Sequence, residues 1–394
     1  MLNRARRPLR GSLWTALSVT LAAMLLVSGC GTGGGSGAAE TQPQNETSSV
    51  AEVELKPGSD AEGVNPTAPV KVSVQHGRIE NVTLKNGAGE KVEGKMGDDG
   101  ASWKPTVALG YDKTYTWSGK AVGEDGKELP IRGSFTTLDP DRTVRATINP
   151  IDNETVGIAM PISIKFDAPV QNKAAAERAL KVEASKPVEG SWAWLTDKQV
   201  DWRPKEYWPA HTEVDVEADL YGVRLGKGEY GTTDLTTHFT IGRSQIVKAN
   251  VDSHRMIVMR GGEQVANYPA SYGKPEPNAL NTPNGTYMVM AKHPVEIMDN
   301  PKYGYTDVEK KWAVRISNHG EFIHENENNK ANIGKRNTSH GCVNLTNADA
   351  KKYFDSALIG DPVEVTGASK TMPPRYAVYD WMLSWQKWKS MSAL

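Results

Sequence analysis

Residues Ser339–Asn344 read Ser-His-Gly-Cys-Val-Asn, a dense run of potentially reactive side chains. Cys342 in this run is one of only two cysteines among the 394 residues of the chain, and His324 precedes it by 18 positions. Acyl transfer by a thiol needs a thiolate, a base that generates the thiolate, and backbone donors for a tetrahedral oxyanion. The run and the upstream histidine supply candidates for all three, so we predict that Cys342 is a nucleophile.

The residues around Cys342 each suggest a role in that chemistry. Gly341 permits a tight bend that presents the amides of Gly341 and Cys342 to one point as an oxyanion hole. His324 ends a strand-like segment and would act as the base from across a sheet. Ser339 and Asn344 carry hydrogen-bonding groups that could orient the histidine or the substrate. A helix expected directly after the run would lower the pKa of the thiol.

Two other interpretations of these side chains have to be weighed. Cys342, His324 and His340 are residue types that bind zinc, but a fourth ligand is hard to find and the chain has no Cys-x-x-Cys or His-x-x-x-His spacing. A buried, unreactive cysteine beside core histidines is the usual state of such residues in isolation. The density of the run argues against that state. We therefore predict neither a metal nor a cofactor.

The second cysteine, Cys30, stands in a different context. Four arginines lie within the first ten residues, residues 13–27 are largely apolar, and small side chains precede the cysteine. This order is typical of a secretory signal, and the apolar run is short for a membrane-spanning helix of ~20 residues. Leu26–Cys30 resembles the bacterial lipobox, so we expect residues 1–29 to be removed and Cys30 to carry lipid. An ordinary signal peptide with an incidental cysteine is the alternative.

Lipidation of Cys30 would anchor the protein at the outer face of the plasma membrane, because each buried methylene contributes ~0.8 kcal/mol. Cys342 would then have no disulfide partner, although exported proteins commonly use paired cysteines. Residues 30–50 are rich in glycine and small polar residues and are expected to form a flexible tether. The net charge of −1 gives no indication of a nucleic-acid partner.

The region from residue 51 to 244 alternates short period-two segments with turns, and it contains an internal repeat. Trp103-Lys104-Pro105 corresponds to Trp202-Arg203-Pro204 about a hundred residues later. Two all-β units of this size fit immunoglobulin-like sandwiches, so we predict one module at residues 51–141 and a second at 142–244. The tryptophans of the repeat are predicted to be core anchors.

Residues 245–367 show a different pattern, with several strand-like segments and one main helix. The helix is predicted over Asn347–Leu358, because apolar residues recur at helical spacing, Thr346 resembles the start of a capping box, and Gly360 can close the helix. Residues 368–394 place several tryptophans on one helical stripe. We predict that this extension packs on residues 245–367, with a membrane-surface helix as the alternative.

These features together resemble the L,D-transpeptidases with a YkuD-type catalytic domain. His324 and the run Ser339–Asn344 are similar to the signature of that domain, and Thr282–Tyr287 is similar to its Thr-Pro-x-Gly-x-Tyr element. The order of lipobox, two modules, catalytic domain and tryptophan-bearing extension resembles the mycobacterial and corynebacterial members. The resemblance implies a mainly β chain, with two immunoglobulin-like β-sandwiches, a sheet-rich catalytic domain at 245–367 and a short helical extension.

The resemblance also implies a two-step reaction on the stem peptides of peptidoglycan. Cys342 would attack the diaminopimelate carbonyl of a tetrapeptide stem, release the terminal D-alanine and form a thioester. The side-chain amine of diaminopimelate on a neighbouring stem would then form a 3→3 cross-link. His324 would be general base and acid, and the backbone of His340–Cys342 would form the oxyanion hole. The catalytic residues are therefore predicted to be Cys342, His324, Ser339, His340 and Gly341.

Members of this family cover the substrate with a hairpin flap, which corresponds here to positions around residues 298–305. The substrate-contacting residues implied by the resemblance are Met298, Tyr303, Tyr305, His319, Gly320 and Asn344. Two alternatives stay open. The first is an L,D-carboxypeptidase, in which water resolves the thioester, and the second is a cell-wall-binding spacer without activity. We expect a monomer.

Three positions depart from the pattern of the family. Glu325 follows the base histidine where other members often have Ser or Gly, and its carboxylate could raise the pKa of that histidine. An aromatic residue that lines the pocket in mycobacterial members is replaced within Asn326–Asn328, so we expect a more polar pocket wall. Some members bind calcium through acidic residues of the second module, where this chain has Arg224 and Lys227, and we predict no calcium there.

Overall fold

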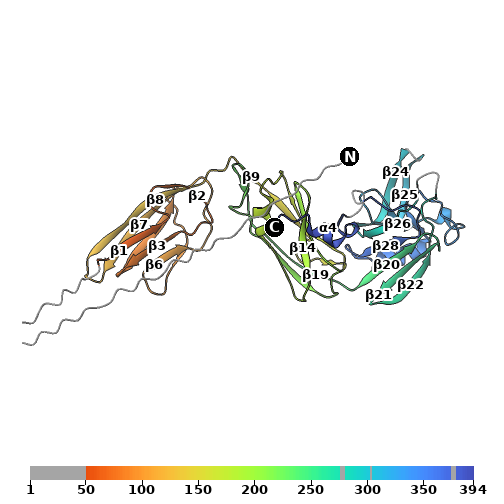
Figure 1. Cartoon of the computed structure of the whole chain (residues 1–394), viewed down its shortest axis with the longest axis horizontal. Helices are drawn as coiled ribbons and strands as arrows, with labels where there is room; N and C mark the ends of the chain where they lie inside the picture. The colour runs from red at the N-terminus through yellow and green to blue at the C-terminus, as the bar shows by residue number, and fades with distance from the viewer. Residues whose placement is uncertain (1–49, 276–279, 302–303, 374–378) are drawn as a thin grey trace, which may run out of the picture. The chain divides into compact units, whose positions relative to one another are not determined.

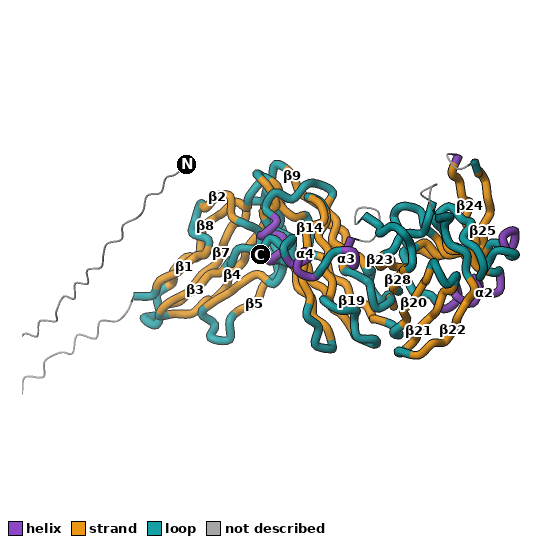
Figure 2. The backbone as a smooth tube through the Cα atoms, turned by 45° about the vertical axis from the view of Figure 1, so that its right-hand side comes forward, coloured by secondary structure: helices purple, strands orange, loops and turns teal. Residues whose placement is uncertain are grey.

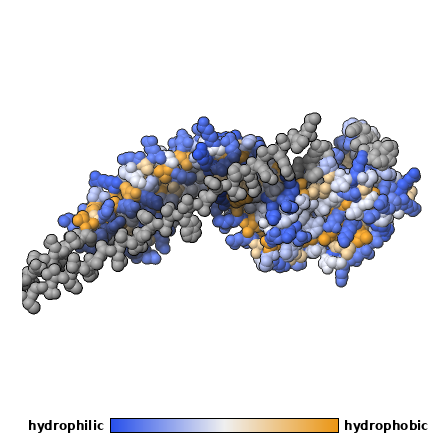
Figure 3. Space-filling model, viewed as in Figure 1, coloured by the Kyte–Doolittle hydropathy of each residue, from blue (hydrophilic) through white to orange (hydrophobic). Residues whose placement is uncertain are grey.

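The computed structural model describes residues 50–275, 280–301, 304–373 and 379–394. Strands make up most of its regular structure and the helices are short (Figures 1 and 2), which confirms the prediction of a mainly β chain. Hydrophilic residues dominate the described surface in Figure 3, with smaller hydrophobic areas between them. The predicted signal peptide, Cys30, the tether up to residue 49 and Tyr303 lie outside the described residues. Within the described ranges, no helix has the length and apolar character needed to cross a membrane.

The first immunoglobulin-like module consists of two four-stranded sheets. One sheet has the order β1 (Glu52–Lys56), β3 (Lys71–Gln75), β6 (Ser102–Pro105) and β5 (Gly94–Met96). The other has the order β2 (Ala61–Val64), β8 (Glu128–Thr137), β7 (Thr114–Gly123) and β4 (Gly77–Asn86). Alternate residues of the strands point inward, as Tyr115 and Trp117 of β7 do, and the two sheets bury one core between them.

The second module repeats this architecture. Its first sheet has the order β10 (Ala146–Asn149), β12 (Ile162–Phe166), β15 (Gln199–Pro204) and β14 (Gly190–Thr196). Its second sheet has the order β11 (Thr155–Val156), β19 (Leu235–Ile241), β16 (Glu213–Ala218) and β13 (Leu180–Ala184). The module also carries helix α1 (Lys173–Arg178) and a small sheet of β17 (Arg224–Gly226), β18 (Glu229–Gly231) and β9 (Arg142–Val144).

The internal repeat of the sequence corresponds to the same packing in both modules. In the first module the ring of Trp103 on β6 covers Gly94 on β5, where an added Cβ would lie 2.0 Å from the ring. In the second module Trp202 on β15 covers Gly190 on β14, where an added Cβ would lie 1.9 Å from the ring. Both tryptophans are buried, which confirms their predicted role as core anchors.

The third part of the chain contains the two sheets that carry the candidate site. The five-stranded sheet has the order β22 (Glu263–Pro269), β21 (Arg255–Arg260), β20 (Gln245–Asn250), β28 (Pro362–Thr366) and β23 (Gly285–Met288). The four-stranded sheet has the order β24 (Ala291–Asn300), β25 (Tyr305–Arg315), β26 (Phe322–Glu325) and β27 (Val343–Leu345). Both sheets share one core with helix α2 (Asn347–Ser356), and the short 3-10 helix η2 (Glu327–Asn329) follows β26.

Helix α2 begins at the predicted residue because Thr346 caps it. The hydroxyl oxygen of Thr346 accepts the N–H of Asp349 at 3.2 Å. The helix ends at Ser356, before the predicted Leu358, and Gly360 takes a positive φ of 89° in the turn that follows. Strand β27 separates the helix from Cys342. The helix thus starts just after the run that contains Cys342, as predicted, but the predicted lowering of the thiol pKa is wrong, because burial raises that pKa.

Strands β24 and β25 form an antiparallel hairpin that projects from the rest of the sheet (Figures 1 and 2). Met298 on β24 and Tyr305 at the start of β25 belong to it, as the resemblance implied. Trp312, near the base of the hairpin, has a φ of 55°, a conformation that is rare for a bulky residue. Its indole N–H donates to Asn347 Oδ1 at 2.9 Å and ties the hairpin to the start of α2.

The C-terminal extension contacts two parts of the chain. Its first residues pack on the catalytic domain, where Asn284 Nδ2 donates to Ala368 O at 2.6 Å and Met372 enters the core. Helices α3 (Tyr379–Met382) and α4 (Trp385–Lys389) follow. Helix α4 lies beside β14 of the second module (Figures 1 and 2), and Trp388 Nε1 donates to Ser191 O at 2.8 Å. The prediction that the extension packs on residues 245–367 is therefore correct for its start and wrong for α4.

Candidate active site

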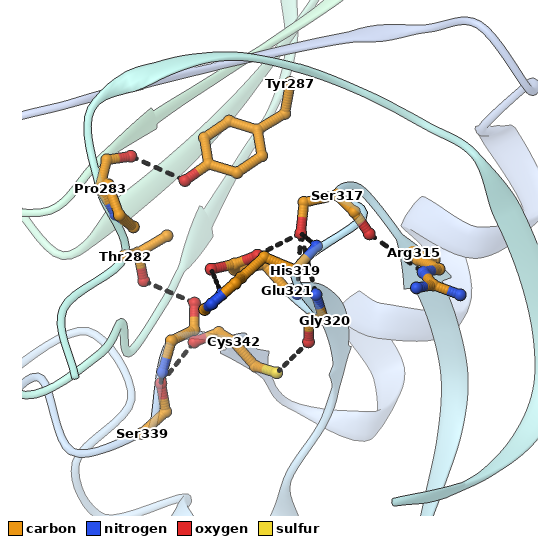
Figure 4. A network of polar contacts seen from close by, with 11 residues as sticks. Thr282, Pro283, Tyr287, Arg315, Ser317, His319, Gly320, Glu321, Ser339 and Cys342 are labelled. Atoms are coloured by element: carbon orange, nitrogen blue, oxygen red, sulfur yellow. Dashed lines mark hydrogen bonds and ion pairs between the residues drawn. The ribbon is translucent and has the colours of Figure 1, made fainter. Parts of the chain in front are cut away.

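Cys342 lies at the entry of β27, which runs parallel to β26. Its thiol points toward the turn before β26, with Sγ 3.8 Å from the carbonyl oxygen of Gly320 (Figure 4). His324 on β26 pairs in register with Asn344 on β27, and His324, Cys342 and Asn344 line one cavity of about 320 Å³. The structure thus brings the predicted nucleophile and the predicted base together.

The turn before Cys342 is held by the side chain of Ser339 (Figure 4). Ser339 Oγ accepts the N–H of Gly341 at 3.2 Å and donates to the carbonyl of Cys342 at 2.6 Å. Gly341 has a φ of 126°, which favours glycine. Because its N–H is bonded to Ser339, the prediction that Gly341 donates to an oxyanion is wrong for this arrangement. The Cys342 N–H makes no hydrogen bond within the described part of the chain and is the remaining candidate donor.

The Thr-Pro-x-Gly-x-Tyr element supports this turn from behind. Thr282 is fully buried, accepts the N–H of Gly273 at 3.0 Å and donates to the carbonyl of Gly341 at 2.8 Å (Figure 4). The hydroxyl of Tyr287 donates to the carbonyl of Pro283 at 2.8 Å and so holds the element against its own strand. The element therefore positions the backbone beside Cys342.

The imidazole of His324 is buried, and its Nδ1 lies 2.6 Å from the carbonyl oxygen of Glu325. A carbonyl can only accept, so Nδ1 carries the proton and Nε2 has the lone pair that a base needs. Burial lowers the pKa of His324 to about 4, and the raising effects of Glu325 are smaller. The charge of Glu325 raises this pKa, as predicted, but burial of the imidazole outweighs it. The Glu325 carboxylate accepts the N–H groups of Lys311 and Glu327 at 3.3 and 3.1 Å.

The thiol of Cys342 is also neutral at rest. Burial raises its pKa to about 12, and the charge of Glu321 adds to the rise. A hydrogen bond from the Phe322 N–H and the charge of Lys310 act in the opposite direction without offsetting the effect of burial. Near pH 7 the site therefore holds a thiol and a neutral imidazole, and a thiolate can form only as its proton moves to a base.

The cavity next to His324 has a polar wall. Asn326, Asn328 and Asn329 line it. Met298 and Asn344 line it as well. The buried Oδ1 of Asn344 has no hydrogen-bond partner among the described residues, so a ligand with a donor group could satisfy it.

A second cavity, of about 380 Å³, opens on the other side of Cys342. His319 and Gly320 line this second cavity only. Tyr305 and His340 line both cavities, with their ring centroids 5.6 Å apart. All predicted site residues that the structure describes therefore lie around Cys342, while Tyr303 falls outside the described residues.

Ser317 and Glu321, which the sequence analysis missed, fix the turn that presents Gly320 to Cys342. Ser317 Oγ accepts the N–H groups of Gly320 and Glu321, both at 3.1 Å, and donates to the Glu321 carboxylate (Figure 4). Glu321 is buried and lines the second cavity. A serine and a glutamate in a turn form no recognisable motif, so only their contacts reveal this role.

Comparison with known proteins matches two domain families to this chain. The bacterial Ig domain matches residues 61–224, and the L,D-transpeptidase catalytic domain matches residues 244–365. L,D-transpeptidase 5 of Mycobacterium tuberculosis (strain H37Rv) is 47% identical over 347 residues, which cover 86% of this chain and 76% of that protein. L,D-transpeptidase 2 of Mycobacterium tuberculosis (strain CDC 1551) is 36% identical over 343 residues, which cover 84% of this chain and 83% of that protein.

Solved structures include one of the LD transpeptidase LdtMt1 in complex with imipenem. It is 32% identical, covers 56% of this chain and 97% of its own, and has a TM-score of 0.48. The sequence identity to the two relatives over most of both chains shows that this chain belongs to the L,D-transpeptidase family. It is a peptidoglycan L,D-transpeptidase.

Proposed function

We propose that Cys342 is the nucleophile of this transpeptidase and that His324 is its general base and acid. The observation that carries the proposal is that both side chains line one cavity from neighbouring parallel strands, with Nδ1 of His324 bonded to Glu325 O. Nε2 is then the basic atom available to the thiol. Ser339 and Gly341 act by shaping the turn at Cys342, and His340 acts as part of the cavity wall.

In the first step the thiol proton moves to His324 Nε2 while Sγ attacks the diaminopimelate carbonyl of a tetrapeptide stem. The carbonyl oxygen gains negative charge, which the Cys342 N–H is placed to stabilise. The bond to the terminal D-alanine then breaks, and the proton on His324 passes to the leaving amine. A thioester on Cys342 remains.

In the second step the side-chain amine of diaminopimelate from a neighbouring stem attacks the thioester. His324 takes a proton from the attacking amine, the C–S bond breaks, and the thiol regains a proton. The product is a 3→3 cross-link. If water takes the place of the amine, the same site is an L,D-carboxypeptidase, and the mass of the product distinguishes the two reactions.

The test of the first step uses Cys342→Ala and His324→Gln with purified tetrapeptide stems. We expect both variants to lose D-alanine release by at least 10³-fold, on the order that removal of a nucleophile or base causes. His238→Gln, which changes a partly exposed histidine of the second module, serves as a matched histidine control. Imipenem should add its mass to the wild-type protein and not to Cys342→Ala. Undiminished D-alanine release by Cys342→Ala would refute the assignment of the nucleophile.

The neutral resting pair predicts a particular pH dependence. Because the pKa of His324 is lowered to about 4, the base stays unprotonated at all higher pH values. Because the pKa of Cys342 is raised to about 12, the fraction of thiolate stays very small across the neutral pH range. The acylation rate of the free enzyme should therefore be flat from about pH 5.5 to 8 and fall below pH 5, measured with stems in single-turnover experiments. A steep rise centred between pH 6 and 8 contradicts this scheme.

We also propose that Cys30 carries a lipid that holds the enzyme at the outer face of the plasma membrane. The lipobox-like segment before it supports the proposal. Cys30→Ala should move the protein from the membrane fraction to the soluble fraction without changing its activity on soluble stems.

Deletion of residues 51–141 should spare the activity on soluble stems and reduce cross-linking in cells, because the first module would act as a stalk. Equal loss of both activities contradicts the stalk.

A further inference from the structure

The cavity beside His324 contains a cation for which the reaction scheme above has no use. Lys310 lies on β25 of the hairpin and lines the cavity together with Tyr305 and Val308 of the same strand. Its neighbours Glu309 and Lys311 are exposed, whereas Lys310 is half-buried. Lys310 also borders an outer pocket that Glu325 and Glu327 line, so it lies at the edge of the cavity.

The ammonium group of Lys310 is only partly satisfied by the protein. Its Nζ donates to Asn326 Oδ1 at 3.0 Å, and an ammonium has three N–H donors. Among the described residues Lys310 has no ion-pair partner. The nearby Glu325 carboxylate is occupied by two backbone N–H groups. A half-buried cation in a cavity is better satisfied by an anion that the ligand brings.

The stem peptide that the proposed reaction requires brings such an anion. A tetrapeptide stem carries one carboxylate on its terminal D-alanine, next to the bond that breaks, and another on the D-centre of diaminopimelate, at the far end of that side chain. Either carboxylate of the acyl donor can be brought to a cation beside Cys342.

We propose that Lys310 binds a carboxylate of the acyl-donor stem and thereby makes the enzyme distinguish free from amidated stems. The proposal rests on the proposed function, because it takes the stem as the occupant of the cavity. Lys310 also lowers the pKa values of His324 and Cys342 through its charge, which places it within electrostatic range of the reacting groups. An amide at the recognised position would leave this cation without its counter-charge.

The test compares Lys310→Met with Lys310→Arg, which keeps the charge, and with Lys311→Met, which removes an outward lysine from the same strand. Each protein is assayed with four stems: unmodified, amidated at the D-centre of diaminopimelate, ending in D-alaninamide, and carrying both amides. For the unmodified stem we expect Lys310→Met to lower kcat/KM for D-alanine release by about 10- to 100-fold, as for loss of a charged hydrogen bond. Lys310→Arg should recover most of it, and Lys311→Met should match the wild type.

The amidated stems identify which carboxylate is recognised. The wild type should discriminate against one of the two single amides, and Lys310→Met should treat that amide and the unmodified stem alike. An equal loss on all four stems overturns the proposal, because it means that Lys310 only supports the hairpin. Undiminished activity of Lys310→Met on the unmodified stem overturns it as well.

A binding experiment separates this proposal from the proposed function. Dissociation constants for the same stems are measured with Cys342→Ala and with Cys342→Ala combined with Lys310→Met, so no chemistry is needed. Preference of the first protein for the free carboxylate, lost in the second, supports the role of Lys310 even if Cys342 proves not to be the nucleophile. Equal binding of free and amidated stems to both proteins overturns the role of Lys310 and leaves the nucleophile untouched.

Discussion

Two strands of the two modules have the same sequence pattern and opposite surroundings. They contain Trp103-Lys104-Pro105 in the first module and Trp202-Arg203-Pro204 in the second. Lys104 is exposed. Arg203 is 2% exposed, and its Cζ lies 4.7 to 5.3 Å from three tryptophan rings of the C-terminal extension. These rings belong to Trp381, Trp385 and Trp388. Because the side chains alternate identically in both strands, the difference comes from what covers the outer face of the sheet.

The comparison shows that one fold can provide either a free face or a docking face. In the second module Arg203 Nη2 donates to the carbonyl of Leu383 at 2.9 Å, and the guanidinium stacks among the rings. A desolvated cation over aromatic rings is worth about 2 kcal/mol or more. Met382, directly before Leu383, still contacts the catalytic domain, because its sulfur accepts the N–H of Thr286 on β23 at 3.3 Å. The docking face thus joins the second module to the domain that carries Cys342.

The largest expected effect comes from removing the buried tryptophan of the docking face. Trp388 is fully buried and hydrogen-bonded to Ser191, so Trp388→Ala should destabilise the docked extension by about 3–5 kcal/mol through lost burial and the cavity that remains. Hydrogen-exchange mass spectrometry of residues 379–394 measures the loss of protection. Trp385→Ala is the matched control, because Trp385 is only half-buried and bonds an exposed carboxylate. Equal effects of the two variants would mean that the burial of Trp388 does not decide how firmly the extension docks.

The next prediction sets the two repeat positions directly against each other. Arg203→Met should cost about 2–4 kcal/mol, because it removes the cation from the rings and leaves the Leu383 carbonyl without its donor. Lys104→Met should change stability by no more than about 0.5 kcal/mol, since its side chain is exposed. Thermal unfolding of both variants, followed by tryptophan fluorescence, gives the comparison. Similar shifts in both variants mean that burial of Arg203 contributes little.

The sequence predicted the two modules because their tryptophan strands repeat, and it predicted the catalytic pair because the run around Cys342 is local. It did not predict where α4 docks. A helical stripe of tryptophans indicates that one face is buried but does not name the partner. Here the partner is Arg203, which lies 180 residues before Leu383 in the chain. Contacts of such long range leave no local pattern in a single sequence.

At the site the sequence did not indicate how strongly burial or a competing hydrogen bond acts. Glu325 raises the pKa of His324 as predicted, but enclosure of the imidazole outweighs the carboxylate. Gly341 suggested an oxyanion donor, but the hydroxyl of Ser339 accepts its N–H. The degree of enclosure and the choice among hydrogen-bond partners are not specified by residue type and spacing.

A smaller effect on stability should be the same in both modules, because both pack a tryptophan ring against a glycine of the neighbouring strand. Gly94→Ala and Gly190→Ala each place a methyl group against a buried tryptophan ring. The ring of Trp103 is backed by Trp117 at 5.4 Å, and the ring of Trp202 by Trp208 at 4.9 Å, so neither ring can yield freely. We expect a cost of about 1–3 kcal/mol in each module, measured by thermal unfolding. A cost in only one module would show that the two glycines are not equivalent.

The smallest expected effect concerns two carboxyl groups on the docking face. Asp201 on β15 occupies the place that Ser102 has in the first module, and it contacts Asp380 of α3. Burial raises the pKa of Asp201 from 3.8 to about 6 and raises the pKa of Asp380 well above its usual value. Asp201 adds to the rise at Asp380, whereas the hydrogen bond with Asp380 lowers the pKa of Asp201. The folded chain therefore holds more protons than the unfolded chain above about pH 4.

A group with a raised carboxyl pKa stabilises the folded state at low pH, and this contribution declines as the pH rises through the folded value. Docking of the extension should therefore weaken as the pH rises above about 4, and it should weaken further above pH 6 as Asp380 loses its proton. Asp380→Asn keeps a hydrogen-bond donor for Asp201 but has no proton to lose. The variant should therefore show a weaker pH dependence of docking, and its extension should be more stable at pH 7.5 by on the order of 1 kcal/mol. Hydrogen exchange of residues 379–394 at pH 5 and pH 7.5 measures the pH dependence and the stability of docking.

Ser102→Asp in the first module is the control, because a carboxylate on that uncovered sheet should titrate normally. Identical pH dependence of the wild type and Asp380→Asn would mean that the carboxyl pair does not share its proton across the docking face.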